Sequence, residues 1–116
     1  MAIERFEVGP RMSKVVVHND TVYLAGLVAE KARGASVAEQ TKEILAAIDA
    51  LLAKAGTDKS KLLQATIWLQ DIRTVDEMNA VWDAWVAPGA PPVRACIEAR
   101  LQSPQLMVEI RVIAAK

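Results

Sequence analysis

The spacing of apolar residues changes repeatedly along this chain, between the two-residue period of a strand and the period of about 3.6 residues of a helix. Between Ser36 and Gly56 the apolar residues recur at helical spacing, with most charged residues on the other side. From Leu63 to Leu69 every second residue is apolar, which is typical of a half-buried strand. A chain that mixes the two periods in this way folds as a combined helix and sheet domain.

The order of these segments predicts one α+β domain over residues 1–116, arranged β-β-β-α-β-α-β-β. We expect strands at residues 3–8, 14–19 and 21–28, a helix at 36–56, a strand at 62–70, a helix at 74–87, and strands at 93–101 and 106–114. The turn at Asn19-Asp20 joins the second and third strands as a hairpin. Both helices should cover one face of a single sheet.

Two capping boxes mark where the helices begin. Ser36-Val37-Ala38-Glu39 and Thr74-Val75-Asp76-Glu77 each place a hydroxyl three residues before a glutamate. In this motif each of the two side chains accepts a hydrogen bond from a backbone N–H that the helix leaves unpaired.

The composition excludes several classes of function. The chain has 116 residues, 53% of them hydrophobic, and a formal net charge of zero, so it can bury a core but has no overall attraction to nucleic acid or to a membrane. With one cysteine and one histidine, a zinc cluster and an internal disulfide are both excluded. There is no glycine-rich phosphate loop, and we expect no cofactor and no metal.

The first residues contain no continuous apolar stretch and no segment is apolar enough to span a membrane, so we expect a cytoplasmic protein.

Charged residues alternate with apolar ones in the last two predicted strands. One set, assigned to the side of the sheet without helices, contains Arg94, Cys96, Glu98, Arg100, Glu109 and Arg111. This face could be left in water, could be paired across a subunit interface, or could line a pocket.

These two strands also carry a family signature. The segment Pro92–Leu101, followed by Val108-Glu109-Ile110, resembles the C-terminal pattern P-x-R-x-C and (apolar)-E-(apolar) of the RidA (YjgF/YER057c/UK114) family. Ala25-Gly26 and the helix containing Asn79 also match, so the resemblance spans nearly the whole chain.

The resemblance implies a fold like that of the bacillary chorismate mutase, assembled as a homotrimer with ligand clefts between subunits. It also implies a reactive-intermediate deaminase, which hydrolyses enamines and imines of small 2-amino acids to 2-keto acids and ammonia. The expected partner is then a small carboxylate-bearing metabolite.

Individual roles follow from the matched positions. Arg94 corresponds to the arginine that binds the substrate carboxylate, for which a guanidinium offers a matching planar fork of donors. Glu109 corresponds to the glutamate that positions the water. Cys96 corresponds to a residue that lines the pocket, and without a nearby base it is a poor nucleophile. The alternatives are ion pairs, of Arg94 with Glu98 or Glu109, and of Glu109 with Arg100 or Arg111.

The chain departs from the family pattern at two pocket positions. Met12 falls near the position of a tyrosine, and Ala25-Gly26-Leu27 replaces Ser-Gly-Gln. We expect Met12, Ala25, Cys96 and Asn79 to line the binding pocket beside Arg94 and Glu109. Loss of two polar groups indicates a divergent branch with a different, more apolar substrate.

Two other functions compete with the deaminase. One is a trimer that binds small carboxylates without catalysis, as a sensor or scaffold. The other is the endoribonuclease or translation-inhibitor activity after which parts of the family are named, which the neutral charge disfavours.

Overall fold

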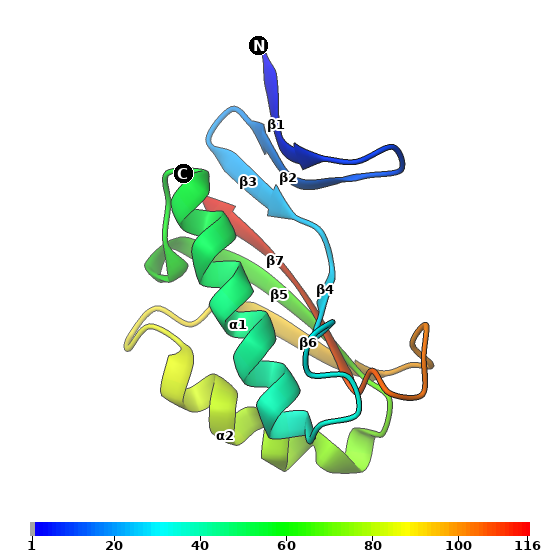
Figure 1. The fold of residues 1–116 in the computed structure, drawn as a ribbon. Helices are drawn as coiled ribbons and strands as arrows, with labels where there is room; N and C mark the ends of the chain where they lie inside the picture. Colours follow the sequence, from blue (N-terminus) through cyan, green and yellow to red (C-terminus); the bar gives the residue numbers. More distant parts are fainter. Residues whose placement is uncertain (1) are drawn as a thin grey trace.

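The computed structural model describes residues 2–116 (Figure 1). Its elements are β1 (Ile3–Val8), β2 (Ser13–His18), β3 (Thr21–Leu24), β4 (Leu27–Val28), α1 (Val37–Lys54), β5 (Leu62–Leu69), α2 (Val75–Trp85), β6 (Val93–Glu98) and β7 (Val108–Ala115). Short 3₁₀ turns, η1 (Lys59–Lys61) and η2 (Ile72–Thr74), precede β5 and α2. The predicted α+β class and the order of the elements are confirmed, with β4 as an addition.

All strands belong to one mixed sheet in the order β1-β2-β3-β7-β5-β6, and β4 pairs with β7. The pairs are antiparallel except β5 with β6, which are parallel and are connected through α2. Such a connection is long because parallel neighbours require a crossover. Both helices cover the same face of the sheet (Figure 1), as predicted.

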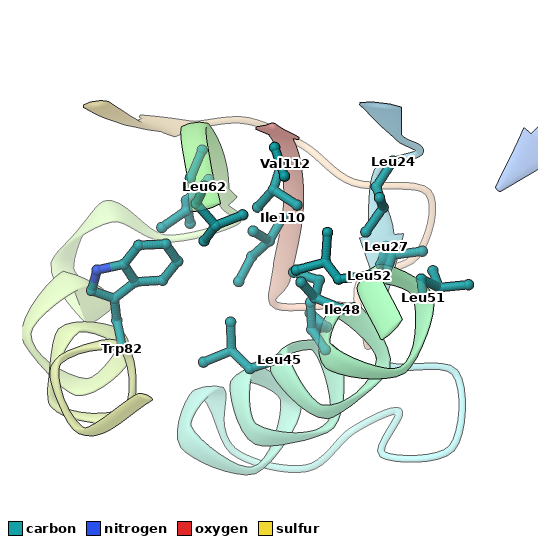
Figure 2. Packing of buried hydrophobic residues seen from close by; sticks show 14 of the residues in the cluster. Leu24, Leu27, Leu45, Ile48, Leu51, Leu52, Leu62, Trp82, Ile110 and Val112 are labelled. Atoms are coloured by element: carbon teal, nitrogen blue, oxygen red, sulfur yellow. The ribbon is translucent and has the colours of Figure 1, made fainter. Parts of the chain in front are cut away.

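The hydrophobic core lies between the helices and the sheet. Figure 2 shows Ile48 and Leu52 of α1 in one cluster with Ile110 and Val112 of β7. Trp82 of α2 belongs to the same cluster. Each of these side chains is buried. Because β7 is the central strand of this layer, its inward residues are fixed on one face and its outward residues, including Glu109, on the other.

The predicted strand at residues 21–28 is interrupted at Ala25-Gly26. The N–H of Ala25 donates to the carbonyl of Lys14 at 2.9 Å, and the chain then leaves β2 and resumes pairing with β7 as β4. The interruption matters because Gly26 lies against the side chain of Glu109.

Of the two predicted capping boxes, the first forms the hydrogen bond expected of its hydroxyl, whereas the second does not form. Ser36 Oγ accepts a hydrogen bond from the N–H of Glu39 at 3.1 Å. Thr74 caps nothing with its side chain, and Glu77 instead accepts from the N–H of Ala38 at 2.9 Å. The carboxylate of α2 therefore caps the neighbouring helix, since the two helices begin side by side.

Strand β5 carries an irregularity at its start that reverses one expected orientation. The register with β7 shifts between Leu62 and Gln64. As a result Leu62 is buried, whereas Leu63, predicted to face the core, is 50% exposed.

Buried Gln40 of α1 holds the segment that leads into β7. Its Nε2 donates to the carbonyls of Ala35 and Gln105, at 3.1 and 2.9 Å, and its Oε1 accepts from the N–H of Met107 at 2.8 Å. A buried amide with all these partners fixes the backbone around it.

Within residues 2–116, no helix is long and apolar enough to cross a membrane.

Candidate functional site

A cavity of about 330 Å³ opens on the side of the sheet without helices, where β2, the β3–β4 connection and β7 meet. Its lining residues are Met12, Lys14, Gly26, Leu27, Val28, Glu30, Gln102 and Glu109. Of the pocket residues that the sequence predicted, Met12 and Glu109 are here, and Ala25 immediately precedes Gly26 in the chain.

Glu109 lies directly against Gly26 in this cavity. A Cβ added at Gly26 would lie 3.1 Å from the carboxyl carbon of Glu109 and would overlap one of its oxygens, so the carboxylate in its observed position occupies the space that a side chain at position 26 would take. Burial raises the pKa of the Glu109 carboxyl, and the charge of Arg111 offsets part of that increase. A half-buried carboxylate with a raised pKa, in a cavity, is suited to holding and deprotonating a water.

The ion pairs considered for Glu109 are not formed. Within residues 2–116 no arginine or lysine makes a salt bridge with it. Arg111 lies instead over the ring of Trp68, with 5.5 Å between its guanidinium carbon and the ring centroid. The carboxylate is therefore available to a ligand.

Arg94 lies on the opposite face of the sheet, which corrects the predicted charged face. It pairs in register with buried Ala65, and its guanidinium carbon is 5.4 Å from the ring centroid of Trp82 on α2. Glu98 also faces the helices and accepts a hydrogen bond from the N–H of Ile72 at 3.0 Å. Throughout the described chain neither Glu98 nor Glu109 forms an ion pair with Arg94.

The cause of this reversal is the position of β6 at the edge of the sheet. Alternation shows which residues share a face but not which face is inward, and the apolar set was assumed to be inward. On this strand the helix side offers an indole ring to a guanidinium and an unpaired N–H to a carboxylate. Val93 and Ile97 consequently point away from the helices and are 70% and 46% exposed.

Cys96 and Asn79 belong to the helix side as well. Cys96 pairs in register with buried Ile67 and packs against the core, and burial raises the pKa of its thiol. A raised pKa leaves little thiolate near neutral pH, which argues against a nucleophilic role. Asn79 lies one helical turn before Trp82, and its Oδ1 is buried with no hydrogen-bond partner among the residues described.

The predicted site residues therefore form two groups on opposite faces of one chain. Met12 and Glu109 are in the cavity, whereas Arg94, Cys96 and Asn79 are near the outer edge of β6 and α2. One chain cannot bring the guanidinium and the carboxylate to the same small ligand.

Sequence reasoning missed Lys14, Glu30 and Gln102 as cavity residues. For Lys14 a signal was present, because alternation along β2 places it opposite buried Val15. No such periodicity exists for Glu30 and Gln102, which lie in connecting segments.

In residues 2–116 no cluster of three or more histidine, cysteine, aspartate or glutamate side chains could hold a metal.

Comparison with known proteins gives a consistent family. A protein-family model described as Endoribonuclease L-PSP matches residues 3–116. A RutC family protein of Haemophilus influenzae is 45% identical over 114 residues, covering 98% of each chain, and RutC family protein YoaB of Escherichia coli is 44% identical over 115 residues, covering 99% of each. A crystal structure of a YjgF family member from Neisseria meningitidis superimposes with a TM-score of 0.96 at 47% identity, covering 100% of this chain and 96% of that one.

Proposed function

Because the chain belongs to the YjgF and RutC family, whose model is described as Endoribonuclease L-PSP, we propose that it is a cytoplasmic reactive-intermediate deaminase. It hydrolyses imine and enamine forms of small 2-amino acids to 2-keto acids and ammonia. The observation that supports this best is the Glu109 carboxylate, which is half-buried, forms no salt bridge within residues 2–116 and lies against Gly26 in a small cavity.

The chemistry requires one well-placed water and one proton carrier. The Glu109 carboxylate accepts a proton from water while the oxygen bonds to the imine carbon, the π pair of the C=N bond moves to nitrogen, and Glu109 delivers the same proton to that nitrogen, which regenerates the carboxylate. In the resulting carbinolamine the hydroxyl proton passes through Glu109 to nitrogen, the C–N bond breaks, and C=O forms as ammonia leaves. An enamine enters this sequence after protonation at carbon. Positioning of the water supplies much of the acceleration.

The substrate carboxylate is bound by Arg94 of a neighbouring copy. Within one chain Arg94 and Glu109 lie on opposite faces of the sheet. Because β6 is an edge strand, we place its arginine at the cavity of an adjacent subunit. A guanidinium that contacts an indole through its face keeps free for a carboxylate the hydrogen-bond donors that lie in its own plane.

A homotrimer places these groups together, and the exposed face of the sheet fits this assembly. Tyr23, Val93 and Ile97 are 43%, 70% and 46% exposed on the side without helices, and half-buried Trp68 pairs in register with Ile97. Exposed apolar surface of this kind is typical of a protein interface. Cys96 and Asn79 would then line the cleft from the same side as Arg94, and Met12 and Ala25 from the side of Glu109.

The test generates imines from several amino acids in situ with an amino-acid oxidase and measures release of ammonia. The wild-type protein should accelerate release, and both Arg94→Ala and Glu109→Gln should abolish the acceleration. Arg73→Ala is the matched control, because Arg73 is exposed and paired with Asp71 at 2.8 Å. Binding of 2-keto acids without acceleration would establish a non-catalytic binder instead, and RNA cleavage without imine hydrolysis would establish the ribonuclease.

A further inference from the structure

Lys14 lies in the Glu109 cavity and on the same face of the sheet. It alternates with buried Val15 along β2, and the hydrogen bond from the Ala25 N–H to its carbonyl ties it to the turn that contains Gly26. Its side chain lines the cavity together with Met12 and Glu109. In the single chain this side chain is exposed.

Three charged residues line this cavity: the carboxylates of Glu30 and Glu109 and the ammonium of Lys14. Of the charged lining residues, Glu30 is already bound, since its Oε2 accepts from Arg33 Nη2 at 2.8 Å and from Nε at 3.0 Å. Glu109 is reserved for the water in the proposed mechanism. Within residues 2–116 of one chain, the Lys14 ammonium of this cavity forms no salt bridge to a carboxylate.

From this we infer that the preferred substrates are imines of amino acids with an acidic side chain, and that Lys14 binds the side-chain carboxylate. The inference rests on the proposed function, in which Arg94 of the neighbouring copy binds the other carboxylate and Glu109 acts on the carbon between them. An ammonium is a compact charge that suits a carboxylate approaching from various angles. The cavity, about 330 Å³, is at the small end of the range of about 300–1,000 Å³ for small-molecule sites.

This assignment reverses the expectation of a more apolar substrate. That expectation counted Met12 and Ala25 as replacements for two polar groups. Lys14 adds a full positive charge to the same cavity, and the resulting site selects an anionic side chain rather than an aliphatic one.

The experiment compares the imine of glutamate with that of glutamine, which has nearly the same shape but no side-chain charge. The wild type should hydrolyse the glutamate imine with the higher kcat/KM. Lys14→Met should lower kcat/KM for the glutamate imine by about 10- to 100-fold, the effect of one charge-assisted hydrogen bond, and change the glutamine imine by less than about threefold. Lys14→Arg should restore the preference, and exposed Lys61→Met should leave it unchanged.

Equal rates for the two imines in the wild type, or an equal loss for both in Lys14→Met, would overturn the inference while leaving the deaminase intact. A second readout separates it from the proposed function. Binding of 2-oxoglutarate should be tighter than that of 2-oxovalerate, which has the same number of carbon atoms, and Lys14→Met should remove the difference. If 2-oxoglutarate binds more tightly but no imine is hydrolysed, the deaminase is refuted and the dicarboxylate site is supported. If the two keto acids bind equally, the inference about Lys14 is overturned.

Discussion

Replacement of Gly26 by alanine tests whether the position of the Glu109 carboxylate matters for turnover. An added Cβ would lie 3.1 Å from the carboxyl carbon and would overlap its nearer oxygen. To restore an ordinary contact of about 3.5 Å, that oxygen must move by about 1 Å. A misplacement of this size in a catalytic group can reduce the rate by about 100-fold.

The same substitution should have little effect on folding. Gly26 has no positive φ, so alanine is compatible with its backbone, and the group that must move is the end of a flexible side chain. Alanine also restricts the unfolded chain more than glycine does, which stabilises the folded protein by about 0.4–1 kcal/mol. We therefore expect the free energy of unfolding to change by less than about 1 kcal/mol.

The assay is hydrolysis of the imine that the wild type turns over fastest, with urea unfolding of the same preparations. Gly9→Ala is the matched control, because its Cβ would meet only the carbonyl of Met12 at an ordinary 3.5 Å. Wild-type turnover in a folded Gly26→Ala protein would refute the reasoning, since the carboxylate would then not need its observed position.

Three further predictions concern stability. Burial holds the pKa of Glu109 above its ordinary 4.5, so the folded chain binds the carboxyl proton more tightly than the unfolded chain does. As pH rises and this carboxyl loses its proton, the group therefore lowers the free energy of unfolding. The unfolding free energy of Glu109→Gln relative to wild type should therefore increase from about pH 4 to about pH 7 in urea titrations, and a constant difference would contradict the assigned burial. Leu62→Ala should cost about 2–5 kcal/mol and Leu63→Ala about 0.5 kcal/mol or less by urea unfolding, and the reverse order would disprove the strand irregularity. Glu77→Ala should lose about 1 kcal/mol through the cap that it gives to the other helix, whereas equal losses in Asp76→Ala would assign the effect to the charge of the turn.

Sequence patterns predicted the features of this fold that depend on neighbours in the chain. The helix that begins after Ser36 and the outward orientation of Glu109 follow from local periodicity and capping, and both agree with the structure. The orientation of Arg94 did not follow, because an edge strand can turn either of its alternating sets toward the helices. The partner of Glu77 was missed for a related reason, since the N–H that it caps is 39 residues away in the chain.

The candidate site was predictable in its residue types but not in the positions that the fold gives them. The family signature identifies Arg94 and Glu109 together, yet it contains no information that one chain places these residues on opposite faces of its sheet. Lys14 was passed over because it belongs to no motif, although alternation along β2 placed it on the face of Glu109.

The most direct test of the account is complementation between two inactive variants, Arg94→Ala and Glu109→Gln, refolded together in equal amounts. If each site takes its arginine from one copy and its glutamate from another, random assembly restores about one quarter of the wild-type sites. A mixture of wild type with the double variant should then also show about one quarter of the activity of an all-wild-type sample. A site built within one chain predicts no activity in the first mixture and about one half in the second, and that result would contradict the account.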